Sequence, residues 1–223
     1  MEKLFDYSDK PVTYYSGPRN EMLQFVPEQV ERVLEIGCGT GEFGKTLKLR
    51  KNIEVWGVEL TQNAAKEARA KLDKVLVGNI EEDNLDLPDN YFDCVIFNDV
   101  LEHLVNPWLV LKRVKNTLSD KGYVVASIPN IRYFDIIRQL IDRKEWSYRD
   151  SGILDRTHLR FFTINSIKDM FESCGYTIIN IQGIHGREFP WKFRVFNLFM
   201  KKRYEDMRYL QFACLAKMKA RQQ

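Results

Sequence analysis

The sequence is poor in cysteine and histidine and contains no long apolar run. Its 223 residues include four cysteines and three histidines, and the cysteines are widely spaced with no Cys-x-x-Cys pair. This spacing argues against a disulfide framework and favours a reducing cytoplasm. No run of about 18 uncharged apolar residues occurs, so we expect no membrane-spanning segment. The amino terminus lacks the apolar core of a signal peptide, and we therefore expect a soluble protein.

The charge balance is also close to neutral. The chain has 34 Lys and Arg residues against 31 Asp and Glu residues, a net charge of +3. This excess is too small to predict nucleic-acid binding across the surface. Repeats and low-complexity tracts are absent from the sequence, and no cluster of metal ligands is visible, so we expect no metal. A chain of this length fits one α/β core, and we expect a single domain over residues 1–223.

Apolar runs and amphipathic segments alternate along the first half of the chain. The strands we expect are 32–37, 53–59, 74–78, 92–98 and 121–128, and the helices between them are 41–50, 61–72 and 106–118. This alternation predicts βαβ units and a Rossmann-like, mostly parallel α/β sheet with helices on both faces.

The rhythm changes after the fifth strand. We expect helices at 131–142 and 165–174 and two further strands at 176–184 and 210–218. A short helix within 19–30 would be limited by Pro27. Residues 1–30 are interpreted as an amino-terminal lid, 31–130 as a cofactor-binding core, and 131–163 and 185–208 as inserts on the substrate side.

The first strand breaks into three glycines at alternate positions, Gly37, Gly39 and Gly41, with Glu35 inside the strand. A second acid, Glu59, ends the next strand about 20 residues later, as in a nucleotide site at the carboxyl edge of a parallel sheet. Two ligands fit this pattern. The run from Gly39 to Gly44 also matches the Gly-x-Gly-x-x-Gly fingerprint of a nicotinamide dinucleotide, but Glu42 would repel a diphosphate there.

The other ligand is S-adenosylmethionine, because residues from about 30 to 184 resemble the class I S-adenosylmethionine-dependent methyltransferases in their order of motifs. The resemblance implies that the three glycines border the amino-acid part of the cofactor. It also implies that Glu59 binds the ribose hydroxyls, and that a last antiparallel strand returns between its predecessors to make a seven-stranded sheet. The complete set of implied cofactor residues is Tyr15, Arg19, Glu35, Gly37, Gly39, Gly41, Glu59, Leu60, Asn79, Ile80, Asn98, Asp99 and Val100.

Two histidines are candidates for catalysis. His103 follows the fourth strand, where the methyl group would lie, and the Glu-His pair at this position is similar to that in quinone-pathway methylases. His158 belongs to the segment Asp155–Phe162, which resembles one in methyltransferases of glycan clusters. Each could act as a general base or position the acceptor. Alternatively, His103 caps the following helix or packs against the cofactor, and the segment of His158 forms a polar network that holds the loop against the helix that starts after Thr163.

The acceptor would meet residues that follow the fifth strand and the lid. The candidate substrate residues are Tyr14, Pro129, Asn130, Asp155, Arg156 and Arg160. Residues 187–208 carry seven Lys and Arg residues interleaved with aromatics. This composition is consistent with peripheral contact with a membrane or a lipid-linked substrate, with a homodimer contact, or with a lid.

These features predict a methyltransferase that acts on a small molecule. We expect O-methylation of a sugar or glycan precursor, or else of a phenolic or quinone metabolite. The alternatives are a catalytically inactive S-adenosylmethionine-binding module and an NAD-dependent oxidoreductase.

Overall fold

The computed structural model describes residues 17–50, 52–82 and 84–219. Its strands are β1 (Arg32–Ile36), β2 (Glu54–Glu59), β3 (Lys74–Val77), β4 (Phe92–Asn98), β5 (Leu118–Pro129), β6 (Tyr176–Gly186) and β7 (Tyr209–Met218). The α-helices are α2 (Glu42–Arg50), α3 (Gln62–Ala68), α4 (Pro107–Thr117), α5 (Phe134–Arg143), α6 (Ile164–Ser173) and α7 (Trp191–Phe199). Short 3-10 helices are η1 (Asn20–Phe25), η2 (Leu101–His103) and η3 (Glu205–Arg208).

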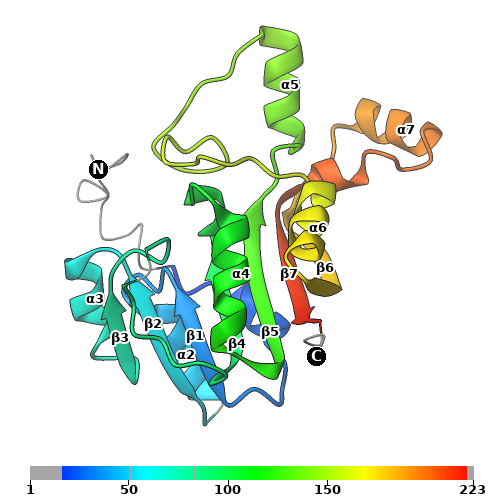
Figure 1. Cartoon of the computed structure of the whole chain (residues 1–223). Helices are drawn as coiled ribbons and strands as arrows, with labels where there is room; N and C mark the ends of the chain where they lie inside the picture. The colour runs from blue at the N-terminus through cyan, green and yellow to red at the C-terminus, as the bar shows by residue number, and fades with distance from the viewer. Residues whose placement is uncertain (1–16, 51, 83, 220–223) are drawn as a thin grey trace.

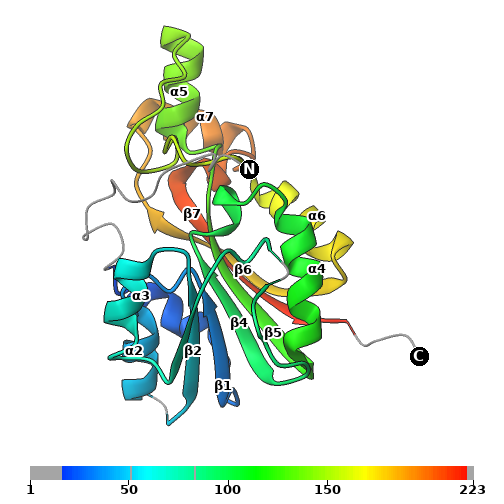
Figure 2. The ribbon, with the colours of Figure 1, turned by 60° about the vertical axis from the view of Figure 1, so that its left-hand side comes forward.

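The strands form one sheet in the order β3-β2-β1-β4-β5-β7-β6, shown in Figures 1 and 2. The pairs among β1 to β5 are parallel, while β7 pairs antiparallel with both β5 and β6. The last strand therefore returns between its two predecessors, and the predicted seven-stranded, mostly parallel sheet is confirmed. The order reverses beside β1, where an open α/β sheet provides its ligand crevice.

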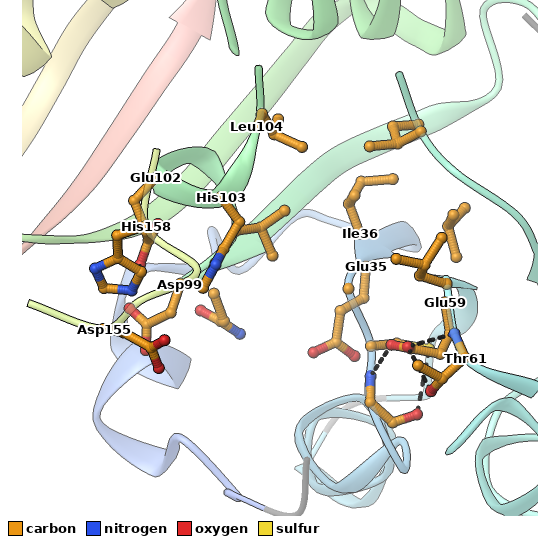
Figure 3. Close-up of a pocket in the computed structure, with 18 of the residues that line it drawn as sticks. Glu35, Ile36, Glu59, Thr61, Asp99, Glu102, His103, Leu104, Asp155 and His158 are labelled. Carbon is orange, nitrogen blue, oxygen red and sulfur yellow. Dashed lines mark hydrogen bonds and ion pairs between the residues drawn. The ribbon is translucent and has the colours of Figure 1, made fainter. Parts of the chain in front are cut away.

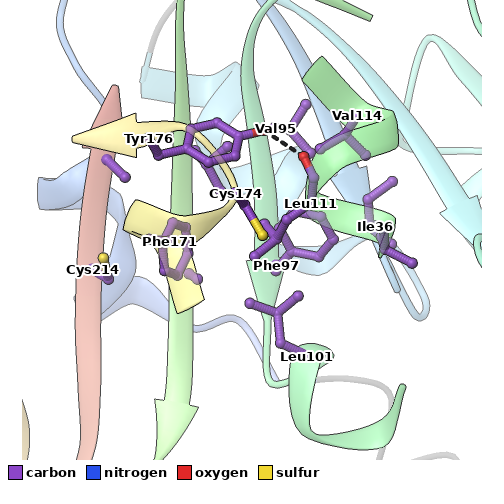
Figure 4. Packing of buried hydrophobic residues seen from close by; sticks show 14 of the residues in the cluster. Ile36, Val95, Phe97, Leu101, Leu111, Val114, Phe171, Cys174, Tyr176 and Cys214 are labelled. Atoms are coloured by element: carbon purple, nitrogen blue, oxygen red, sulfur yellow. Dashed lines mark hydrogen bonds between the residues drawn. The ribbon is translucent and has the colours of Figure 1, made fainter. Parts of the chain in front are cut away.

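Alternating side chains of the strands reach the two faces of the sheet. On β1, Val33 joins a core with residues of η1, α2 and α3, while Leu34 joins a core with residues of α4 and α6. Figure 4 shows the second core, in which the hydroxyl of Tyr176 donates a hydrogen bond of 2.7 Å to the carbonyl of Leu111. Helices thus cover both faces, as the alternation of strands and helices predicts.

Local signals fix most helix ends near the predicted positions. Asn106 caps α4 through a 3.0 Å bond from the amide of Leu109, with Pro107 in the first turn. Thr163 and Ser166 form a capping box at the start of α6. α5 begins at Phe134 rather than 131, because the Asn130 side chain accepts a bond of 3.0 Å from the Arg132 amide and closes a turn there.

Two predicted helices are shorter than expected. The segment predicted as a helix over 61–72 is helical only from Gln62 to Ala68. The chain then turns, which lets Leu72 pack in the core beside Ala68. The lead-in helix predicted within 19–30 is a single 3-10 helix of six residues. Among the described residues, no helix combines the length and apolarity that crossing a membrane requires.

Candidate active site

A cavity of about 1340 Å³ opens at the carboxyl ends of the parallel strands. Its wall combines the turn after β1, the ends of β2 and β3, the segment after β4, and the loop that precedes α6. Figure 3 shows that Glu35, Glu59 and Thr61 lie at one end, and that Glu102, His103, Asp155 and His158 gather at the other. We call these two ends the glycine half and the histidine half.

The turn after β1 brings backbone close to the cavity. Gly37 and Gly39 line it, with φ angles of 67° and 53°. A Cβ at Gly37 would lie 2.6 Å from Cγ2 of Val100, so the close approach itself demands glycine. Gly41 does not line the cavity. Its φ is 79°, and a Cβ there would lie 3.1 Å from Cα of Ala68, so it serves the packing of α3.

Glu59 ends β2 with its carboxylate held at two points. One oxygen accepts 2.9 Å bonds from the amide and the hydroxyl of Thr61, and the other accepts a 2.9 Å bond from the amide of Gly39. The side chain lines the cavity yet is only 5% exposed. Carboxylate oxygens have further acceptor capacity, so this fixed pair can still receive hydroxyl donors.

Glu35 lies deeper in the same half. Its side chain is buried, and burial raises its pKa to about 8, with a smaller contribution from the charge of Glu59. The backbone of Gly44 offsets this only in part. One oxygen of Glu35 and both polar atoms of the Asn98 side chain are buried without a hydrogen-bond partner in the described structure. The glycine half therefore contains unsatisfied polar groups that face a ligand cavity.

Asp99 marks the boundary between the two halves. One of its oxygens accepts a 2.8 Å bond from the hydroxyl of Ser127 and a 2.9 Å bond from the amide of Gln211, while the other pairs with Arg19. Arg19 also contacts Glu21 at 2.9 Å through Nε. The guanidinium thus joins the lead-in segment to the sheet at the rim of the cavity.

The remaining predicted cofactor residues also border the cavity. They are Leu60, Asn79, Ile80 and Val100. Asn79 accepts a 3.0 Å bond from the amide of Glu81, so its side chain shapes the turn after β3. The prediction for Tyr14 and Tyr15 lies outside the described residues.

The histidine half is built by two segments far apart in the sequence. His103 ends η2, and His158 comes from the loop before α6; their ring centroids are 4.6 Å apart in an edge-on arrangement. The loop is tied to η2 because the amides of Leu159 and Arg160 donate to the carbonyl of Glu102 at 2.9 and 3.0 Å. Glu102 itself is 1% exposed, and burial raises its pKa well above the usual range.

Some of the predicted substrate residues line the cavity, and others lie behind its wall and hold it in place. Pro129 and Asp155 line the cavity. Asp155 accepts bonds of 2.9 and 2.8 Å from the amide and hydroxyl of Thr157, which form the turn that presents His158. Asn130 is fully buried and donates to the carbonyls of Asp206 and Tyr209 at 2.9 and 3.0 Å.

Two predicted arginines lie away from the cavity wall. Arg156 faces solvent and contacts Asp150 at 3.2 Å. Arg160 donates to the carbonyl of Val105 and so fastens the loop to the segment after η2. Both side chains therefore support the position of the loop in this structure.

Several residues that line the cavity were not predicted as site residues, and Glu102, Ile153 and Gln211 are among them. Glu102 directly precedes His103 in the sequence, so its position next to a predicted site residue could have indicated that it lies near the cavity. Gln211 lies at the start of β7, which reaches the cavity only because that strand returns beside β5. Ile153 carries no local signal, since its position depends on the path of a long loop.

The fold and the site together define a class I S-adenosylmethionine-dependent methyltransferase. A family profile described as a methyltransferase domain matches residues 12–181, and the chain belongs to this family. S-adenosylmethionine is accordingly its cofactor. The first glycine turn and the acid of β2 lie within the matched range, so the dinucleotide interpretation loses its basis.

Relatives with curated descriptions include one that has no assigned activity. An uncharacterized protein of Methanocaldococcus jannaschii is 35% identical over 155 residues, which cover 69% of each chain. A ubiquinone biosynthesis O-methyltransferase of Bradyrhizobium diazoefficiens is 33% identical over 105 residues, 44% of this chain and 40% of that protein. The match thus spans less than half of the latter relative.

Solved structures share the fold at lower identity. A SAM-dependent methyltransferase of Archaeoglobus fulgidus has a TM-score of 0.65 at 24% identity, over 85% of this chain and 87% of that one. The [4+2]-cyclase SpnF has a TM-score of 0.59 at 15% identity, over 85% of this chain and 75% of that one. These likenesses concern the fold, since one fold hosts several chemistries.

Proposed function

We propose that the protein transfers the methyl group of S-adenosylmethionine to an oxygen atom of a small molecule. The observation that carries this proposal is the division of one cavity into a glycine half and a histidine half. The first offers a close backbone approach and a fixed carboxylate, as an adenosyl ligand needs. The second offers two imidazoles beside the place where a methyl group would be presented.

The glycine half would hold the cofactor. The two oxygens of Glu59 suit the two vicinal ribose hydroxyls, and Leu60, Asn79 and Ile80 would border the adenine. Gly37, Gly39 and Val100 would border the amino-acid part, with Glu35, Asn98 and Asp99 nearby. The unpartnered amide of Asn98 supports this arrangement, because a buried amide gains free energy when a ligand satisfies it. Arg19 would meet the cofactor carboxylate by sharing its present pairing with Asp99.

The histidine half would bind and deprotonate the acceptor. The bound cofactor supplies an electrophilic methyl group and a neutral thioether leaving group. The imidazole of His103 or His158 would take the hydroxyl proton as the oxygen attacks. Alignment of the two reactants and exclusion of water would supply the rest of the lowering of the activation barrier. Ile153 and Leu159 give this half an apolar wall that excludes water.

The apolar wall of the histidine half and the names of two relatives both bear on the class of acceptor. Apolar side chains beside two imidazoles suit the ring of a phenolic or quinol metabolite. Relatives named ubiquinone biosynthesis O-methyltransferases support the same class, although they match only part of this chain. A sugar or glycan precursor is the other acceptor that the Asp155–Phe162 segment supports.

A methyl-transfer screen tests this proposal. Purified protein is incubated with S-adenosylmethionine and panels of catechols, monophenols, quinols, nucleotide sugars and simple glycans, and S-adenosylhomocysteine release is measured. We expect turnover with at least one hydroxyl compound and the methyl group on oxygen by mass spectrometry. Tight S-adenosylhomocysteine binding without turnover on any panel would instead favour a catalytically inactive cofactor-binding module.

We also propose that residues 187–208 contact an anionic membrane surface that carries the acceptor. On α7, Trp191 is 68% exposed and Phe199 is 85% exposed. Lys192 and Arg194 lie on the same helix, and Lys201–Arg203 follow it. The structure gives none of these five cations an ion pair within the described residues, whereas Arg208 pairs with Glu188 and Glu205.

The arrangement of this face supports a bilayer as the occupant. Figures 1 and 2 place α5 and α7 at one end of the molecule, beyond the end of β5 that leads to the cavity. Exposed aromatic rings with unpaired cations complement an apolar layer under anionic headgroups. Vesicles containing anionic lipid should co-sediment the protein, and the double variant Trp191→Ser/Phe199→Ser should remain in solution. Equal behaviour of the two proteins, or concentration-dependent dimers without vesicle binding, would refute this contact.

A further inference from the structure

Glu102, His103 and His158 form a compact cluster of possible metal ligands in the histidine half. Each offers one ligand atom, and the three atoms lie within 4.8 Å of one another. An oxygen of Glu102 lies 3.9 Å from Nε2 of His158. Figure 3 shows these side chains turned toward a common space, next to Asp99 and Asp155. No contiguous motif announces the cluster, because His158 follows the other two by more than fifty positions in the sequence.

Backbone carbonyls fix the tautomers of both histidines. Nδ1 of His103 lies 3.1 Å from the carbonyl of Thr157, and Nδ1 of His158 lies 2.9 Å from the carbonyl of Ile153. A carbonyl only accepts hydrogen bonds, so in each neutral ring Nδ1 carries the hydrogen and Nε2 carries the lone pair. Metal-binding histidines are oriented by this kind of bond from the second nitrogen.

Glu102 provides the second, independent observation. Its carboxylate is buried, and neither oxygen has a hydrogen-bond partner within the described structure. Such a group is costly to bury unless something compensates it. The neighbouring acids cannot provide a partner while ionised. Asp99 is held by Ser127 and Gln211, and Asp155 is held by Thr157. A cation would satisfy Glu102 and offset the local negative charge.

We propose that Glu102, His103 and His158 bind a divalent transition-metal ion of the zinc type. Two imidazole nitrogens and one carboxylate oxygen are a typical donor set for zinc, whereas magnesium and calcium prefer oxygen ligands. Tetrahedral zinc at about 2.1 Å from each ligand needs ligand atoms about 3.4 Å apart. The three side chains would therefore draw together when the ion binds. The fourth position would face the cavity, as in catalytic zinc sites with three protein ligands.

The role of this ion rests on the proposed O-methylation. An acceptor hydroxyl at the open position would have a lower pKa and a fixed orientation toward the methyl donor. With zinc bound, His103 and His158 are ligands rather than bases, so the hydroxyl proton would leave to solvent as the oxygen forms its bond to the methyl carbon. The carbon–sulfur bond would break with its electron pair remaining on sulfur. Binding of the ion itself does not depend on this role.

Metal titration tests the site without measuring activity. Full-length protein is freed of metal with a chelator and titrated with Zn²⁺ by calorimetry and with Co²⁺ by visible absorption. We expect one ion per chain and the absorption bands of four-coordinate cobalt. The substitutions Glu102→Gln, His103→Asn and His158→Asn should each weaken zinc binding by at least about 100-fold, since each removes a ligand. His185→Asn is the matched control and should bind as the wild type does, because His185 lies outside the cavity wall and contacts Glu21.

Two outcomes would overturn the site: no saturable zinc binding, or binding that the three substitutions leave unchanged. Circular dichroism and S-adenosylhomocysteine titration of the same samples confirm that each variant is folded. Metal-free protein that binds S-adenosylhomocysteine but no zinc refutes the metal site and leaves the methyltransferase proposal standing. Protein that binds zinc but fails to methylate any hydroxyl compound supports the site and refutes the proposed reaction.

Discussion

The two halves of the cavity are built in different ways. In the glycine half, the polar contacts join neighbouring strand ends, as in the bonds of Glu59 to Gly39 and Thr61. In the histidine half, Glu102 and His103 meet His158 from a distant loop, and the carboxylate of Glu102 is unsatisfied within the described residues. The first half is therefore preformed by adjacent strand ends, and we propose that it binds the cofactor. The second is assembled by tertiary structure, and we propose that it binds the acceptor.

The largest effect should come from the histidine half. His103→Ala should lower kcat by roughly 10²–10⁴-fold, since it removes a group placed at the acceptor. The affinity for S-adenosylhomocysteine should stay within about threefold of the wild type, which calorimetry measures. Ordinary turnover in this variant would shift the catalytic assignment to His158. A large loss of cofactor affinity would break the division into two halves.

Glu35 should make stability depend on pH. Burial raises the pKa of Glu35 from its ordinary value of 4.5 to about 8 in the folded state, so ionisation favours the unfolded chain above pH 4.5. The stability present below that pH is therefore lost as pH rises toward 8, by about 1.4 kcal/mol per pH unit. Compared with Glu35→Gln in urea unfolding, the wild type should lose about 3–4 kcal/mol across this window. Parallel pH profiles for the two proteins would contradict this assignment.

Glu59→Ala should weaken cofactor binding by about 1–3 kcal/mol, because buried ribose hydroxyls would lose charge-assisted hydrogen bonds. Titration with S-adenosylhomocysteine measures this change. Glu67→Ala is a suitable control, since Glu67 is an exposed residue of α3 and does not line the cavity. Equal losses in the two variants would place the ribose elsewhere.

A pair of glycine substitutions separates backbone strain from collision. Gly37→Ala combines a positive φ with a Cβ 2.6 Å from Val100, whereas Gly152→Ala has a φ of 85° and no atom within 4 Å of its Cβ. Both should lose about 1 kcal/mol of stability through strain. Gly37→Ala should lose more stability than Gly152→Ala because of the collision with Val100. In thermal unfolding, adding Val100→Ala to Gly37→Ala should remove this additional loss. Identical losses would show that the turn tolerates a side chain at that point.

The sequence placed Gly37, Gly39 and Glu59 near one another because the signals of the glycine half are local, whereas Gly41 does not line the cavity. Each of the glycines and Glu59 follows an apolar run, so the parallel sheet alone places them at one edge. Helix ends were predicted where caps such as Asn106 and Thr163 are present. The predicted length of α3 was wrong, because burial of Leu72 overrides helical propensity after Ala68.

The histidine half was predicted only in outline. His103 and His158 stood out as single candidates, but their contact depends on the amides of Leu159 and Arg160 bonding to Glu102. No periodicity encodes that pairing. For the same reason the supporting positions of Asn130, Arg156 and Arg160 could not be distinguished from acceptor contacts. Their roles depend on the path of a loop rather than on the strand to which they are adjacent.

Calorimetric titration with S-adenosylhomocysteine and, separately, with NAD determines which ligand the glycine half binds. The glycine half should bind one S-adenosylhomocysteine per chain and give no saturable heat with NAD. Saturable NAD binding together with no response to S-adenosylhomocysteine would show that the glycine half binds a dinucleotide instead.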